Sequence, residues 1–201
     1  DEIIIENNKK NIDTNLLYSF LDKNVFKIEK VFKNFVKTIN VIIESDIIFT
    51  VQMSIKKSDY EDSISDKKLI HLLNEAKNET KRTIDSKKII HMIINNYLAD
   101  NNNYIKLPQD LIFKSLCLNI SFICLPIWYI KDLEETLKKF QITVNQISSA
   151  EYVKSFLNKT HNDLFEMCQR LIDGHNPNEV KIVPKTRKNI GFFERFFNFF
   201  N

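Results

Sequence analysis

The stretch Leu111–Cys124, which reads LIFKSLCLNISFIC, decides the fold of this 201-residue chain. Alternating residues separate into two faces, as they do in a β-strand. The apolar face consists of Ile112, Leu116, Leu118, Ile120, Phe122 and Cys124. The other face carries Ser115, Asn119 and Ser121. A long strand with one apolar and one polar face predicts a sheet that is covered on one side.

Segments on either side of this strand alternate between helical and strand periodicity. Ser63 and Asp66 form a capping-box pattern, which predicts the start of a helix. The buried side of that helix would carry Leu69, Ile70, Leu72, Leu73 and Ala76. A strand over 87–96 follows, and residues 100–108 are rich in turn-forming types.

Downstream, Pro126 favours the start of a helix over 127–140. Its predicted inward residues are Ile130, Leu133, Leu137 and Phe140. A short strand over 142–147 would close the unit. This order of elements predicts an α+β domain over 63–147, with helices on one face of an antiparallel sheet.

In the N-terminal part, residues 1–62, the spacing of apolar residues predicts a helix followed by a strand. Residues 1–15 are typical of an edge strand or a frayed arm. Apolar residues then recur at three- or four-residue spacing, which predicts an amphipathic helix that ends near Ile43. These residues are Val25, Ile28, Phe32, Phe35, Ile39 and Ile42. The β-branched run over 47–55 predicts a strand.

The composition argues against several classes of function. The 29 basic and 26 acidic residues leave a net charge of only +3, so no strong field indicates a nucleic-acid partner. With Gly174 and Gly191 as the only glycines, the chain offers no phosphate-cradling loop, and we expect no cofactor. Three cysteines in apolar surroundings indicate reduced thiols in a cytosolic protein. The four histidines are scattered, which speaks against a zinc site.

Two further helical patterns precede the C-terminal end. They cover 150–158 and 162–173 within a segment that we assign to 148–174, and Gly174 is placed to terminate the second helix. Residues 175–190 contain two prolines and several basic residues, which predicts a flexible basic tether.

The last segment, residues 191–201, reads GFFERFFNFFN. Wound as a helix, it gathers six phenylalanines on one side and leaves Glu194, Arg195, Asn198 and Asn201 on the other. Eleven residues of helix span only ~16 Å, which is too short to cross a bilayer but suits a helix lying in its surface.

Basic residues before the helix would face anionic headgroups. The predicted membrane-binding residues are Phe192, Phe193, Phe196, Phe197, Phe199, Phe200, Lys185, Arg187, Lys188 and Arg195. The alternative is a helix that packs back on its own core.

Two other functions compete with membrane attachment. Interleaved Lys and Phe on a sheet can bind nucleic acid, but acidic residues are mixed among the lysines and the strand phenylalanines are isolated. The alternative to a membrane-bound scaffold is a soluble α+β adaptor that binds nucleic acid or another partner and whose C-terminal helix packs on its own core. Acidic pairs such as Glu134 with Glu135 are typical of solvated helix faces, and no catalytic motif orders the Ser, His and Asp residues, so we expect no enzyme.

Two stretches resemble the FtsA family of actin-like bacterial cell-division proteins. The run from Ile89 to Asp100, with His91 and Tyr97, looks like a strand of the domain inserted into FtsA. Residues 142–150 look like the strand and small-residue turn that return the chain to the actin-like body, and 25–55 is similar to the helix and strand upstream of the insert. FtsA also carries a C-terminal amphipathic helix.

The resemblance implies a bacterial membrane-bound scaffold of the division machinery. Its place would be the cytoplasmic side of the inner membrane, and its partners anionic lipid, other division proteins and further copies of itself. It implies an insert-like domain flanked by remnants of an actin-like fold. Phosphate loops and the second half of that fold have no counterpart here, which speaks against ATP binding and against direct binding to FtsZ.

Overall fold

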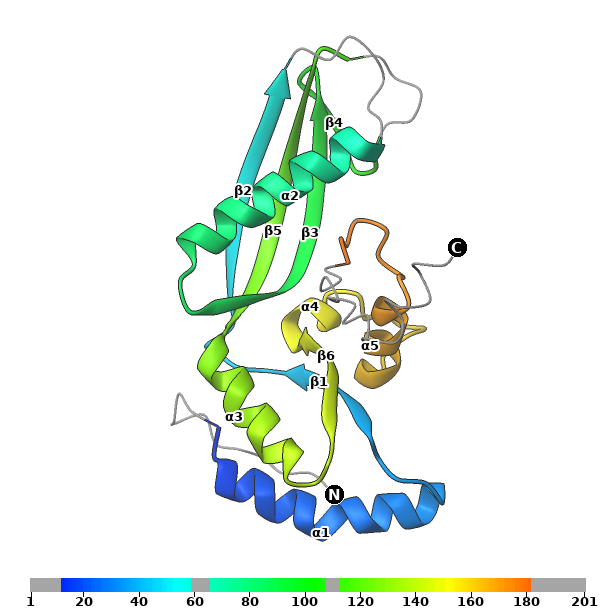
Figure 1. Cartoon of the computed structure of the whole chain (residues 1–201). Coiled ribbons are helices and arrows are strands. Elements are labelled where there is room, and N and C mark those ends of the chain that lie inside the picture. The colour runs from blue at the N-terminus through cyan, green and yellow to red at the C-terminus, as the bar shows by residue number, and fades with distance from the viewer. Residues whose placement is uncertain (1–11, 59–65, 108–112, 182–201) are drawn as a thin grey trace, which may run out of the picture.

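The computed structural model describes residues 12–58, 66–107 and 113–181, and this part of the chain has an α+β fold. It contains five helices, a four-stranded antiparallel sheet in the order β2-β5-β3-β4, and a two-stranded parallel sheet of β1 and β6. The four-stranded sheet is long and narrow, and the two-stranded sheet lies near one of its ends (Figure 1).

The predicted long strand is confirmed as β5, although it spans Ser115–Pro126 and begins later than predicted; it lies in the interior of the larger sheet. It pairs antiparallel with β2 (Phe49–Ser58) on one side and with β3 (Lys87–Ala99) on the other. The short strand β4 (Asn102–Tyr104) forms a hairpin with the end of β3, within a stretch that the sequence predicts as a turn.

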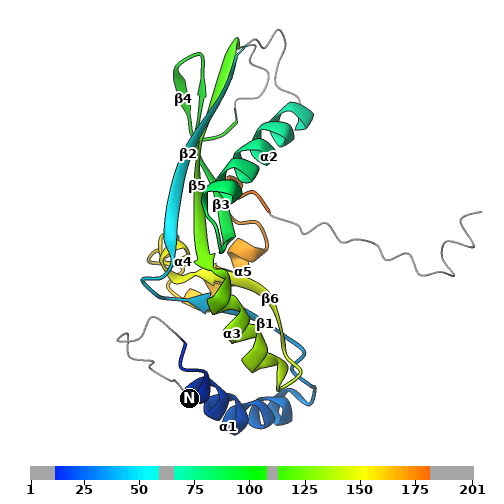
Figure 2. The ribbon, with the colours of Figure 1, turned by 60° about the vertical axis from the view of Figure 1, so that its left-hand side comes forward.

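The two faces of this sheet differ as predicted. Helix α2 (Asp66–Thr83) covers the apolar face (Figures 1 and 2). Its Leu72 and Ala76 are buried against that face, whereas Ile70 is exposed. The buried residues of β5 on that face are Leu116, Leu118, Ile120, Phe122 and Cys124. Residues 63 and 112 lie outside the described part.

On the opposite face, side chains from three strands form a polar line. The Ser54 hydroxyl donates a hydrogen bond of 2.6 Å to Asn119, whose amide donates one of 2.7 Å to Asn96. Near β1 and β6 this face is covered by helices. Helices α4 (Ala150–Lys154) and α5 (Leu164–Ile172) pack there on Ile123. Helices therefore lie on both faces rather than on one.

The predicted helix ending near Ile43 is wrong at both ends. Helix α1 (Thr14–Phe32) begins earlier, because the Asp13 carboxylate accepts hydrogen bonds from two backbone amides of the first turn. It ends at Lys33, whose φ of 53° places that residue in the left-handed region. Phe32 and Phe35, which the helical pattern turns inward, are exposed.

The residues after that turn form β1 (Thr38–Ile43), which pairs in parallel with β6 (Thr143–Ser149). The sequence placed β6 in the antiparallel unit and β2 in the N-terminal segment. The structure reverses this, because the long β2 pairs with β5 along its whole length, whereas β6 completes a separate sheet.

Helix α3 (Ile127–Lys138) follows β5 directly, as Pro126 predicts. It buries its inward side against α1 and the parallel sheet, which creates a second core. The buried residues there are Ile43, Leu125, Ile130, Leu133, Leu137, Ile142 and Ile147. Helix α1 lies across the end of the molecule that is remote from the tips of β2 and β5 (Figures 1 and 2).

Candidate functional site

The predicted membrane-binding residues all fall within 182–201, outside the described residues. The structure therefore describes the chain that leads to them, up to Lys181. That segment, 175–181, was predicted to begin a flexible tether. The structure instead packs it against β3, α4 and α5, so that the folded part of the chain extends to Lys181.

A tight turn delivers the segment from α5. The amide of Gly174 donates to the Leu171 carbonyl at 3.0 Å, and the His175 amide donates to the Arg170 carbonyl at 2.9 Å. This pair of bonds is a Schellman motif, and Gly174 adopts a φ of 95°, which favours glycine. Gly174 ends the helix as predicted.

The segment then runs antiparallel to β3 along an edge that β4 leaves uncovered. Ile94 donates its backbone N–H to the Asn178 carbonyl at 2.9 Å, and Val180 donates its own to the Met92 carbonyl at 2.8 Å. The Lys181 ammonium donates to the Ile172 carbonyl at the end of α5, at 3.0 Å. A cation there is favourable, since carbonyls point outward at a helix C-terminus.

The centre of the contact is a largely buried carboxylate, that of Glu179. One of its oxygens accepts from His91 Nδ1 at 2.7 Å, and the other accepts from the Tyr152 hydroxyl at 2.8 Å. His91 is 2% and Glu179 13% exposed. Asn176 donates to the same hydroxyl at 2.9 Å. The site thus joins β3, α4 and the C-terminal segment.

The histidine in this cluster is a neutral tautomer. The backbone N–H of Ser149, at the end of β6, donates to His91 Nε2 at 3.1 Å, so that nitrogen carries no proton. Nδ1 must then carry the proton that it shares with Glu179. The cluster therefore holds one carboxylate with two neutral donors.

The phenol in the cluster stays protonated. Burial raises the pKa of Tyr152, and the nearby negative charge of Glu179 raises it further. The Ser149 hydroxyl is also engaged, because it caps α4 by accepting from the Tyr152 amide at 3.4 Å. Through these hydrogen bonds, the cluster fixes the C-terminal segment against β3 and α4.

Two other residues of the run from Ile89 to Asp100 have structural roles. The Tyr97 side chain is buried, and burial raises its pKa. The Asp100 carboxylate accepts from the Lys114 and Ser115 amides, the shortest bond being 2.8 Å, and these bonds lower its pKa. Asp100 thereby ties the β3–β4 turn to the start of β5.

Sequence reasoning singled out His91 but missed Glu179 and Tyr152. The overlooked signal is the alternation of Glu179, Val180 and the residues after it, which is typical of a strand rather than of a tether.

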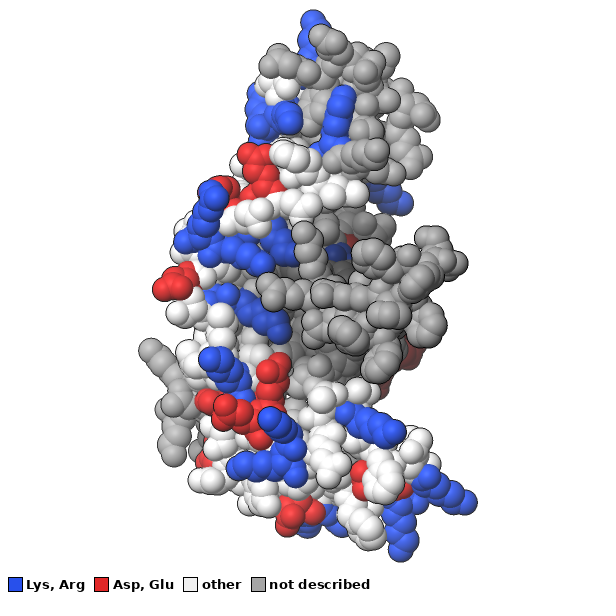
Figure 3. All heavy atoms as spheres, viewed as in Figure 1, with Lys and Arg blue, Asp and Glu red and all other residues white. Residues whose placement is uncertain are grey.

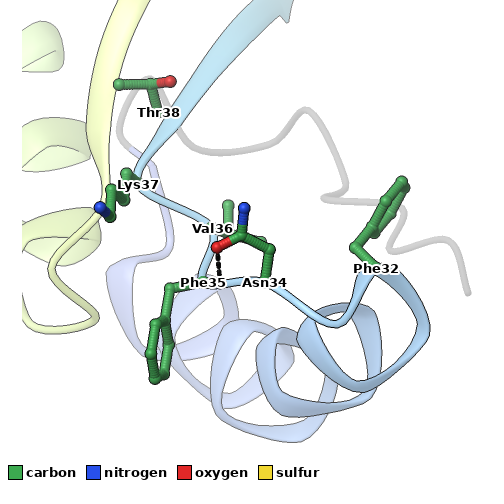
Figure 4. A pocket seen from close by; sticks show the side chains of 6 residues that line it. All are labelled: Phe32, Asn34, Phe35, Val36, Lys37 and Thr38. Carbon is green, nitrogen blue, oxygen red and sulfur yellow. Dashed lines mark hydrogen bonds between the residues drawn. The ribbon is translucent and has the colours of Figure 1, made fainter.

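Other candidate sites are weaker. Among the described residues, no three His, Cys, Asp or Glu side chains gather as a metal ion would require. In the same part of the chain, no helix combines the length and apolar character needed to cross a bilayer. A shallow pocket lies at the turn between α1 and β1 and is lined by Phe32 and by the residues from Asn34 to Thr38 (Figure 4).

The chain matches no known protein-family model, and no curated protein sequence matches it.

Proposed function

We propose that this protein is a bacterial membrane-associated scaffold of cell division, similar to FtsA, that works without ATP hydrolysis. Its C-terminal segment of residues 191–201 binds the cytoplasmic side of the inner membrane, and the folded part recruits other division proteins. The observation that carries the proposal is the Glu179 contact, because it fixes the chain shortly before the phenylalanine-rich segment.

The residue at which the chain leaves the folded part matters for a scaffold. If the chain were free from residue 175, the folded part would be connected to the membrane by sixteen residues up to residue 190. Because the contact holds it as far as Lys181, nine residues separate the fold from the segment, which is roughly 30 Å at full extension. A shorter connection keeps the partner-binding surfaces close to the membrane.

The composition of the segment supports reversible membrane binding. Burying one phenylalanine side chain contributes roughly 1.5–3 kcal/mol, and each lysine or arginine near an anionic surface about 1 kcal/mol. Six phenylalanines, even half-buried, supply several kcal/mol against the cost of ordering a short helix. Several copies gathered by partners would bind more tightly than one.

The arrangement of the strands supports the likeness to FtsA. The resemblance implies an inserted α+β unit followed by a strand that returns the chain to a separate body. Here β6 leaves the antiparallel sheet region and pairs with β1, which precedes that sheet in the chain. Since phosphate loops need glycine and the chain has only Gly174 and Gly191, we propose a scaffold that does not hydrolyse ATP.

Sedimentation with vesicles tests the proposal. The full chain should pellet with vesicles that contain phosphatidylglycerol, whereas Phe193→Glu with Phe197→Glu should abolish pelleting and leave the circular dichroism spectrum unchanged. Replacing Lys185, Arg187 and Lys188 by Gln should weaken binding to anionic vesicles but not to neutral ones. If the double variant unfolds, the segment belongs to the core and the proposal fails.

A further inference from the structure

The outward side of α1 is unusual, because it combines exposed apolar side chains with lysines. Lys23, Phe26, Lys27 and Lys30 follow the i, i+3, i+4, i+7 spacing of a single helix face. Val31 borders this face, and Phe35 follows in the turn after the helix. We call these six residues the basic α1 face.

The apolar members of the basic α1 face are about three-quarters exposed. Phe26 is 73%, Val31 77% and Phe35 76% exposed. Figure 4 shows Phe35 projecting past α1, whereas Phe32 points to the other side of the turn. The inward side of α1 is already used, since Leu17, Leu21 and Val25 pack against the core that α3 contributes to. Burial of these exposed side chains therefore requires something outside the described fold.

The positive charge around these apolar side chains indicates which kind of surface covers them. Residues 22–37 contain five lysines and two carboxylates, which leaves a net charge of +3. One of those carboxylates, Glu29, accepts from the Val36 amide at 3.0 Å. Within the described part, Lys23, Lys30, Lys33 and Lys37 form no ion pair with an acidic side chain. Figure 3 shows lysine side chains projecting from the end of the molecule where α1 terminates.

This combination fits a lipid surface better than a protein. Lysine is depleted in the cores of protein–protein interfaces, whereas lysines beside an anionic membrane are attracted to its headgroups. Phenylalanine and valine between the lysines can enter the boundary between headgroups and acyl chains. We propose that the basic α1 face is a second membrane contact, which binds anionic lipid. This inference rests on the proposed function, because the C-terminal segment brings the chain to the membrane.

A second contact would give the scaffold a defined orientation. With the C-terminal segment alone, the folded part can rotate about its connection. With α1 also on the surface, the long antiparallel sheet points away from the membrane, since α1 lies across one end of the molecule (Figures 1 and 2). The tips of β2 and β5 would then reach furthest into the cytoplasm.

Fluorescence quenching in the full chain tests this contact. The single tryptophan, Trp128, is replaced by Phe, and Phe26→Trp places the probe on α1. Vesicles of phosphatidylglycerol and phosphatidylcholine with brominated acyl chains should quench this probe. A control with Ile70→Trp, an exposed apolar position on α2, should not be quenched.

The two proposals fail differently in this experiment. If the chain pellets with vesicles but the probe at position 26 is not quenched, the α1 contact is overturned and the C-terminal anchor stands. If the chain does not pellet at all, the proposed function itself fails.

A charge variant supplies an independent measurement. Lys23→Gln with Lys30→Gln should lower the affinity of the full chain for anionic vesicles by roughly 25-fold, about fivefold for each lysine. The matched control is Lys56→Gln with Lys57→Gln at the far end of β2, which should leave the affinity unchanged. If the α1 variant binds vesicles normally but dissociates a dimer in sedimentation velocity, a second copy covers this face and the lipid contact is wrong.

Discussion

The four-stranded and the two-stranded sheet are held together by different kinds of contact. In the larger sheet, β5 has a partner on each side and its apolar face is closed by α2. In the smaller sheet, as far as the described residues show, each strand is an edge, and the core depends on α1 and α3. The Glu179 cluster connects the two, because His91 lies in β3 and Ser149 ends β6. The larger sheet has a complete core of its own, whereas the smaller one depends on its neighbours.

The largest effect should come from the centre of the larger sheet. Phe122 is completely buried in the middle of β5, so Phe122→Ala should lower the free energy of unfolding by about 3–5 kcal/mol. Urea denaturation followed by circular dichroism measures this change. Phe165→Ala, at an exposed position on α5, is the control and should have little effect. Equal losses for both variants would contradict the difference in burial.

A substitution in the smaller sheet should cost less and act locally. Ile147 in β6 is buried but lies in a sheet made of edge strands that can relax, so Ile147→Ala should cost about 2 kcal/mol. Hydrogen exchange should accelerate for the amides of β1 and leave those of β5 protected. Uniform acceleration across both sheets would show that they unfold as one unit.

The connection between the two sheets can be tested at Glu179. Glu179→Ala leaves the His91 N–H and the Tyr152 hydroxyl without their acceptor, which should cost about 2 kcal/mol. The Val180 amide, bonded to Met92, should then exchange faster. Glu179→Gln retains an acceptor for His91 and should cost less. If both variants are as stable as the wild type, the cluster does not fasten the C-terminal segment.

The smallest effect on stability should come from Asp100, at the tip of the larger sheet, and it should depend on pH. The pKa of Asp100 in the folded protein lies below its ordinary value of 3.8, because backbone amides donate to the carboxylate. Its contribution to stability is present above about pH 4 and is lost as the pH falls through the lowered pKa. Asp100→Asn should therefore reduce the loss of stability on acidification, as measured by urea denaturation at pH 7 and at low pH. An unchanged pH dependence would contradict this role.

The sequence predicted β5, the start of α3 and the end of α5 because their signals are local. The alternation in β5, Pro126 before α3 and Gly174 after α5 each act within a few residues, and all three predictions are confirmed. The sequence misassigned β1 because Thr38–Ile43 continues the apolar spacing of α1, and only its partner β6 makes it a strand. A pairing over such a distance leaves no local pattern. The role of Glu179 could not be predicted for the same reason, because its partners His91 and Tyr152 are remote in the sequence.

The parallel pairing of β1 with β6 also sets an order of assembly during synthesis. Thr38 pairs with Thr143, so β1 must wait for about 105 further residues to leave the ribosome, which takes roughly 5–20 s at usual translation rates. By then β2, β3 and β5 have all emerged and can close on α2. Until α3 and β6 emerge, α1 and β1 lack their packing partners, so we expect this half of the molecule to be the more exposed to chaperones and proteases during synthesis.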